Sequence, residues 1–202
     1  MKLQIQAVAT ENPPLVGGHP ALDLLNTVPR MDGELVDLLQ SDQDVVRWLA
    51  MVGWPLAHEA RGLKTSSLLH TARALRETIR TLVERLKAGK RVDVEPLNIF
   101  LDEARSSLRL VTNGRDGINL ERQWMRNTPQ QALAPIAESA AELIALGDLE
   151  LMRQCEDEAC VLWFYDRTKS HHRRWCSVST CGNRNKVKAF RERKGQPPPQ
   201  QR

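Results

Sequence analysis

Residues 155–184 read CEDEACVLWFYDRTKSHHRRWCSVSTCGNR and contain all four cysteines of the 202-residue chain. The cysteines form two C-x4-C pairs, Cys155 with Cys160 and Cys176 with Cys181, separated by fifteen residues. Clustered cysteine pairs favour a metal site, and four thiolates give the closed tetrahedron that is typical of structural zinc. We therefore predict one structural Zn²⁺ held by these four residues, with no open coordination position for catalysis.

The redox state of these cysteines depends on the compartment. No apolar run approaches the length of a membrane span, and the N-terminal residues MKLQIQAVATENPPLVGG lack the apolar core of a secretory signal. We expect a cytoplasmic protein that does not insert into membranes, and cytoplasmic thiols stay reduced. Two redox disulfides and four unrelated buried thiols are the other interpretations. His171 and His172 lie between the pairs, but four cysteines already fill the site, so we expect surface histidines.

The residues around the cysteines predict a small finger made of a hairpin and a helix. Val161–Tyr165 is strand-like, and a short hairpin would bring the two cysteine pairs together. The segment after Cys181, GNRNKVKAFRERK, predicts a helix in which Val187 and Phe190, three apart, dock on the zinc core. We expect a treble-clef-like or ribbon-like zinc finger that has too little apolar surface to fold without metal.

The preceding part of the chain is predicted to be mainly helical with a small antiparallel hairpin. Apolar residues recur at steps of three and four, and capping residues mark the helix ends. The predicted helices cover 42–52, 67–88, 94–105 and a segment from Pro129 to Gly147, and the predicted strands cover 107–112 and 118–126. We expect three parts: a mostly helical domain over residues 1–148, the finger over residues 149–194, and a flexible tail over residues 195–202.

One face of the predicted helix 67–88 is rich in charge. Arg73, Arg76, Arg80 and Arg85 alternate there with Glu77 and Glu84. A basic face can bind nucleic acid, but the interspersed acids favour an ordinary solvated surface.

The basic charge is instead concentrated in the finger. Residues 1–150 carry 17 basic and 20 acidic side chains, whereas residues 151–202 carry 12 and 5. Such a basic end joined to an acidic body predicts that the end meets a polyanion, with a solvated basic tail as the alternative. The candidate nucleic-acid contacts are Lys169, Arg173, Arg174, Asn183, Arg184, Lys186, Lys188, Arg191, Arg193 and Lys194.

Two of these candidates have competing interpretations. Asn183 and Arg184 have side chains that can read base edges, whereas Arg174 and Arg184 could equally bond carbonyl groups near the zinc knuckles. The basic residues after Cys181 spread around the helical wheel, so the sequence does not select a binding face. One finger offers few contacts, and we expect a homodimer formed through the helical body.

Polar residues near the N-terminus are candidates for effector binding. His19, Asp23 and Asn26 lie in a turn-rich segment with buried leucines, where turn and capping hydrogen bonds are the simpler explanation.

Several motifs resemble known families. Cys155-Glu-Asp-Glu-Ala-Cys160, Phe164-Tyr-Asp166, Arg174-Trp175-Cys176-Ser177 and Cys181-Gly182-Asn183-Arg184 are similar to the CGNR zinc finger family, which consists of bacterial proteins. Gly17-Gly18-His19, Leu22-Asp23 and Asn26-Thr27 resemble the start of the ABATE domain, a stress-induced transcription regulator. The resemblance implies zinc ligation by the four cysteines, DNA binding and stress regulation. Thr168-Lys-Ser-His-His172 departs from the family pattern.

Three functions are therefore considered. The first is a DNA-binding transcriptional regulator with an effector-sensing or dimerising helical domain, and the second is an RNA-binding or ribosome-associated zinc module. Trp163, Phe164 and Trp175 are expected to form the small core rather than a stacking platform for RNA. The third is an enzyme with a site around His19, Asp23 and Asn26. It is disfavoured because the sequence contains no recognisable catalytic motif.

Overall fold

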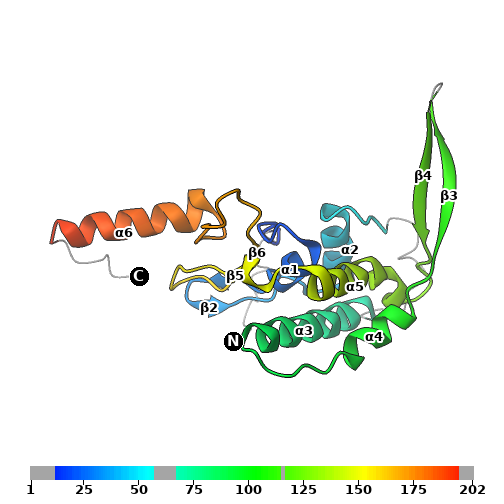
Figure 1. Ribbon diagram of the computed structural model, residues 1–202, viewed down its shortest axis with the longest axis horizontal. Coiled ribbons are helices and arrows are strands. Elements are labelled where there is room, and N and C mark those ends of the chain that lie inside the picture. The colour runs from blue at the N-terminus through cyan, green and yellow to red at the C-terminus, as the bar shows by residue number, and fades with distance from the viewer. Residues whose placement is uncertain (1–11, 57–66, 115–116, 196–202) are drawn as a thin grey trace, which may run out of the picture.

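The computed structural model describes residues 12–56, 67–114 and 117–195, which form a helical body with two projecting parts (Figure 1). The body helices are α1 (Pro20–Leu25), α2 (Asp42–Met51), α3 (Ser67–Lys87), α4 (Glu95–Asp102) and α5 (Pro129–Leu146). The other elements are β1 (Arg30–Met31), β2 (Glu34–Leu35), β3 (Ser106–Asn113), β4 (Gly117–Trp124), η2 (Leu149–Leu151), β5 (Met152–Gln154), β6 (Trp163–Tyr165), η3 (Val178–Gly182) and α6 (Asn183–Arg193). The prediction of a mainly helical chain with small antiparallel sheets is confirmed.

The short helix α1 lies at the centre of the body. It packs against α3, α5 and β6, and its three leucines and Ala21 are buried. Helix α1 is only six residues long, so its apolar pattern was too short to show whether the segment is a helix or a strand. Trp163 of β6 lies in the same apolar core as the leucines of α1.

The longer helices follow their sequence signals. Ser41 caps α2 by accepting a hydrogen bond from the Asp44 backbone at 3.2 Å, and Thr128 caps α5 by accepting one from Gln131 at 3.2 Å. Helix α3 places its apolar stripe against α5 and α1. The end of α3 lies one residue from its predicted position at 88, within the usual variation of helix ends.

The arginine face of α3 differs from the solvated surface that we predicted. Arg76 is only 4% exposed and forms a two-pronged ion pair with Asp37, with nitrogen–oxygen distances of 2.8 and 2.7 Å. Arg76 also donates to the Thr27 hydroxyl at 2.9 Å. The prediction was wrong here because an acid from a distant loop, 39 residues away in the chain, pairs with this face.

The hairpin of β3 and β4 stands away from the body (Figure 1). Its eight-residue strands pair from Ser106 with Trp124 to Asn113 with Gly117, as the turn-forming residues between them predict. Its residues 115–116, like the predicted tail beyond Gly195, lie outside the described residues. No helix in the described ranges is both long and apolar enough to cross a bilayer.

Candidate metal centre and finger surface

The first cysteine pair occupies the connection between β5 and β6. The backbone N–H of Cys155 donates to the Leu162 carbonyl at 2.9 Å, and that of Cys160 donates to the Asp157 carbonyl at 2.8 Å. We had expected the hairpin to lie between the two pairs, but its first strand, β5, precedes Cys155. The alternating signal of a three-residue strand was too short to detect.

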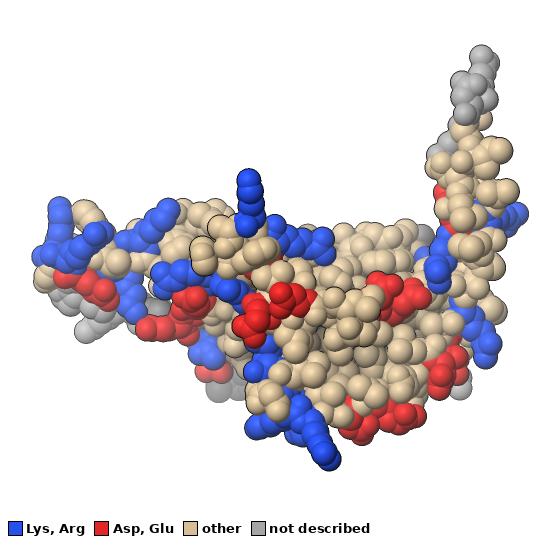
Figure 2. All heavy atoms as spheres, viewed as in Figure 1, with Lys and Arg blue, Asp and Glu red and all other residues tan. Residues whose placement is uncertain are grey.

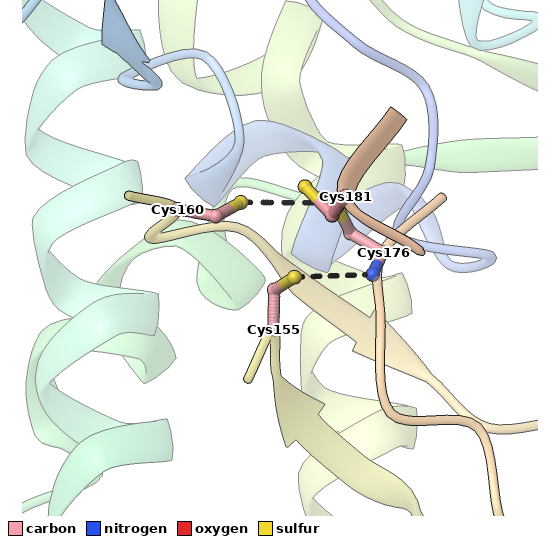
Figure 3. Close-up of side chains that lie close together, drawn as sticks. All are labelled: Cys155, Cys160, Cys176 and Cys181. Atoms are coloured by element: carbon pink, nitrogen blue, oxygen red, sulfur yellow. Dashed lines mark hydrogen bonds between the residues drawn. The ribbon is translucent and has the colours of Figure 1, made fainter. Parts of the chain in front are cut away.

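The second pair follows a long loop and leads into α6. Ser177 caps the π-helical turn η3 by accepting a hydrogen bond from the Thr180 backbone at 3.3 Å. The Cys176 backbone N–H donates to the Cys155 sulfur at 3.4 Å and so joins the two knuckles. The four sulfurs lie within 4.8 Å of one another (Figure 3).

The sulfur arrangement fits one zinc ion. The Sγ atoms of Cys160 and Cys176 are 3.7 Å apart, and those of Cys176 and Cys181 are 3.6 Å apart. Zinc bonded to four sulfurs at about 2.3 Å gives a tetrahedron with edges of roughly 3.8 Å. The four cysteines therefore form a site for one structural zinc.

The titration of these thiols also favours a cation. A hydrogen bond from the Cys176 thiol lowers the pKa of Cys160 to about 5, whereas hydrogen bonding to Cys160 and burial raise the pKa of Cys176. Burial and nearby negative charge also raise the pKa of Cys181. One thiolate is thus accommodated readily, but four thiolates at these distances require a divalent cation between them.

Arg173 supports the knuckles rather than facing solvent. Its guanidinium donates to the carbonyl oxygens of Val16 at 3.1 Å, Trp175 at 3.0 Å and Cys176 at 2.5 Å. The guanidinium also lies 4.3 Å from the centroid of the buried Phe164 ring. These contacts give Arg173 a structural role, which the sequence analysis had considered only for Arg174 and Arg184.

Asp166 fixes the loop that returns to Cys176. Its fully buried carboxylate accepts hydrogen bonds from the Thr168 backbone at 3.0 Å, the Thr168 hydroxyl at 2.6 Å and the Arg173 backbone at 2.8 Å. Burial alone would raise the pKa of Asp166, but these hydrogen bonds outweigh it and hold the pKa below its usual value. Nearby His171 and His172 are exposed, as predicted.

The acids inside the first knuckle bind the basic residues of the finger. Glu156 accepts from Arg174 at 2.6 Å, Asp157 from Arg184 at 3.3 Å, and Glu158 from Lys188 at 2.7 Å. Three predicted nucleic-acid contacts are therefore ion-paired within the finger. Because the pairs join residues 18 to 30 positions apart, the sequence alone did not reveal them.

Asp157 and Asn185 join α6 to the knuckles. The Asn185 amide donates to the Asp157 carboxylate at 2.8 Å and to the Cys181 carbonyl at 2.9 Å, and Asp157 is only 4% exposed. Asn185 was not among the predicted site residues. The sequence feature that could have indicated its role is its position one helical turn after the zinc ligand Cys181. These contacts define the face of α6 that meets the rest of the finger.

The remaining candidates lie on the outside of the finger. Asn183 donates to the Ser179 carbonyl at 3.1 Å and is exposed. Val187 and Phe190 are 45% and 51% exposed, so the prediction that they dock on the zinc core was wrong. Lys169, Lys186, Arg191, Arg193 and Lys194 form no ion pair with the described residues.

The predicted effector residues lie where the finger meets the body. Asn26 is 1% exposed, donates to the Trp163 carbonyl at 2.9 Å and accepts from the Trp163 backbone at 2.8 Å. Asp23 accepts from the Gly17 backbone at 2.7 Å, and burial raises its pKa to about 6. His19 is half-buried, and burial lowers its pKa. The amide of Asn26 is thus fully engaged with β6.

A hollow of about 490 Å³ lies on another side of this junction. Its lining combines α3, β2 and the finger hairpin, and the residues are Val28, Leu35, Asp37, Arg76, Glu77, Arg80, Glu84, Gln154 and Val161. None of the three predicted effector residues lines it. A small molecule would therefore have room at this hollow.

Comparison with known families agrees with the two parts of the structure. A family model described as "Putative stress-induced transcription regulator" (ABATE) matches residues 18–147, which is more than half of the chain. The chain belongs to the ABATE family. The CGNR zinc finger model matches residues 152–194 and so includes all four cysteines of the ABATE protein. Neither family is an enzyme family. A search of curated proteins finds no match.

Proposed function

We propose that this ABATE protein is a transcriptional regulator that binds duplex DNA through its CGNR finger. The observation that carries the proposal is the exposure of α6, which projects from the body with no buried residue along its eleven positions (Figure 1). A helix this polar adds nothing to a core. Zinc and the knuckle contacts hold it in place, which leaves it available for a partner.

The inner contacts of α6 identify its outer face. Asn185 and Lys188 point toward the first knuckle, so residues about half a turn away point outward. At 3.6 residues per turn, the outer face carries Lys186, Phe190 and Lys194. This face combines positive charge with exposed apolar groups, a combination suited to phosphates and thymine methyl groups in the major groove.

The charge distribution supports the same surface. In Figure 2, blue Lys and Arg side chains gather over the end of the molecule that α6 occupies in Figure 1. The knuckle acids neutralise Arg174, Arg184 and Lys188 on the inner side. Phosphate contacts are therefore assigned to Lys186 and Lys194 on the outer face and to Arg193 at its edge. An α-helix with its side chains is about 10–12 Å across and fits a major groove about 12 Å wide.

DNA binding is tested by electrophoretic mobility of duplex fragments with zinc-loaded protein across a salt series. Lys186→Ala with Arg193→Ala should weaken binding and reduce the slope of log affinity against log salt by about 2. Lys188→Ala is the matched control, because it removes a positive charge that is already paired with Glu158. Equal effects of the two changes, or no binding by the wild type at low salt, would exclude this surface.

Two further parts of the proposal concern the kind of nucleic acid and the place where an effector would bind. Competition between duplex DNA and RNA for one preparation identifies the nucleic acid, since a basic finger can serve either. The regulatory part is assigned to the hollow between α3 and the finger, where an effector would touch both parts of the protein. A stress signal acting there would reach α6 through the β5–β6 hairpin.

A further inference from the structure

The β3–β4 hairpin has one strongly apolar face that nothing in the described chain covers. Side chains alternate between the two faces of a hairpin, and the register places Leu108, Leu110, Ile118 and Leu120 on the same face. Their exposed fractions are 63%, 68%, 72% and 63%. Four neighbouring aliphatic side chains with such exposure mark an interaction surface.

The opposite face of the hairpin is polar. It carries the exposed residues Ser107, Arg109, Asn119, Glu121 and Gln123 and one half-buried apolar residue, Val111. A polar face suits water, and a two-stranded hairpin is only marginally stable by itself unless its apolar face is covered. The alternation therefore indicates that only the leucine face meets a partner.

We propose that a second copy of this chain covers the face, with hairpin packed against hairpin around a two-fold axis. The apolar residues are arranged for self-complementary contact. Leu110 pairs directly with Leu120 at the centre, and Leu108 and Ile118 lie at opposite diagonal corners. A two-fold contact places the same patch on both sides, so leucines meet leucines.

The charges on this face are compatible with contact between two copies. Its one charged residue, Arg122, already lies 3.5 Å from Glu138, 3.2 Å from the Ser106 hydroxyl and 5.5 Å from the centroid of the Trp124 ring. Arg122 is thus directed to groups of its own chain at the foot of the hairpin. Stacking two such faces brings no unpaired charge into the contact.

The area of the leucine face can be compared with the area that stable dimers bury. Eight residues at about 3.4 Å each give a face roughly 27 Å long, and two strands with their side chains are about 10 Å wide. Stable dimers bury about 800 Å² on each partner, which exceeds what this face alone provides. The contact therefore belongs to the weak, transient class of interface, and we expect a reversible dimer in which two fingers are related by a two-fold axis.

Sedimentation velocity of the zinc-loaded full chain, from about 1 to about 200 μM and without nucleic acid, tests the proposal. The wild type should pass from monomer to dimer over this range. Leu110→Asp with Leu120→Asp should remain monomeric, whereas Asn119→Asp with Gln123→Asp, which adds the same charge to the polar face, should dimerise like the wild type. Zinc stoichiometry and circular dichroism check the fold of each variant.

A neutral pair, Leu110→Asn with Leu120→Asn, keeps the test valid if the charged pair fails to fold, and it should weaken dimerisation at least tenfold. A monomeric wild type at the highest concentration would overturn the proposal. So would unchanged dimerisation of both leucine variants, or assemblies that keep growing beyond dimers. Binding of monomeric wild type to phospholipid vesicles through the same leucines would assign the face to a lipid surface instead.

Discussion

Replacing Asn26 with Ala should loosen the finger from the body. The amide of Asn26 makes two buried hydrogen bonds with the Trp163 backbone, at 2.9 and 2.8 Å, across 137 residues of chain. Alanine leaves a donor and an acceptor of β6 without partners. Each buried group left unpaired costs about 1–3 kcal/mol, so we expect Asn26→Ala to lower the free energy of unfolding by about 4 kcal/mol.

Urea unfolding of the zinc-loaded protein measures this loss. With a slope of about 3 kcal/mol per molar urea, the midpoint should fall by roughly 1.3 M. Amide hydrogen exchange gives the location, because protection should fall in β6 more than in α3. Asn98→Ala is the matched control, since its amide makes a single 3.4 Å bond at the surface and should cost no more than about 0.5 kcal/mol. A loss below 1 kcal/mol for Asn26→Ala, or uniform loss of protection, would refute the assignment.

Three shorter predictions concern the same junction and the zinc site. Gly17→Ala should destabilise the protein by about 1–3 kcal/mol in thermal unfolding, because a Cβ there would lie 2.8 Å from the Asp23 carboxylate and 2.9 Å from its backbone nitrogen. A melting temperature equal to that of the wild type would contradict this crowding. Burial raises the pKa of Asp23 from 3.8 to about 6, so wild-type stability relative to Asp23→Asn should fall by about 2 kcal/mol as the pH rises from 4 to 7. If the difference in stability between the wild type and Asp23→Asn did not change with pH, the carboxylate of Asp23 would not be desolvated. Cys176→Ser should abolish stoichiometric zinc binding in native mass spectrometry while the helical dichroism of the body remains, and retention of one zinc per chain would exclude this ligand.

The sequence predicted the parts of the structure that depend on local pattern. Periodic leucines located α3 and α5, and the turn residues between β3 and β4 located the projecting hairpin. The four zinc ligands were found for a similar reason. Cysteine is chemically distinctive, and four clustered thiols in a reduced environment have few other uses.

The role of each basic residue in the finger could not be predicted in the same way. Arg173 and Lys186 are both basic residues near the knuckles, yet only Arg173 binds backbone carbonyls. The difference depends on tertiary geometry that brings Val16 to within 3.1 Å of a residue 157 positions away. Likewise, the spacing of Val187 and Phe190 predicted an apolar stripe that docks on the zinc core, but both side chains stay exposed among the described residues.

The ABATE domain and the CGNR finger are joined through strand β6 of the finger. Strand β6 pairs with β5 on one side, and on the other side its backbone is held by Asn26 and by the Gly17 carbonyl, which accepts from Tyr165 at 2.7 Å. Trp163 and Met152 lie in the same apolar core as the leucines of α1. Zinc therefore stabilises a knuckle whose strands are also part of the ABATE core. The body and the finger are thus connected by buried hydrogen bonds and shared packing rather than by a flexible linker.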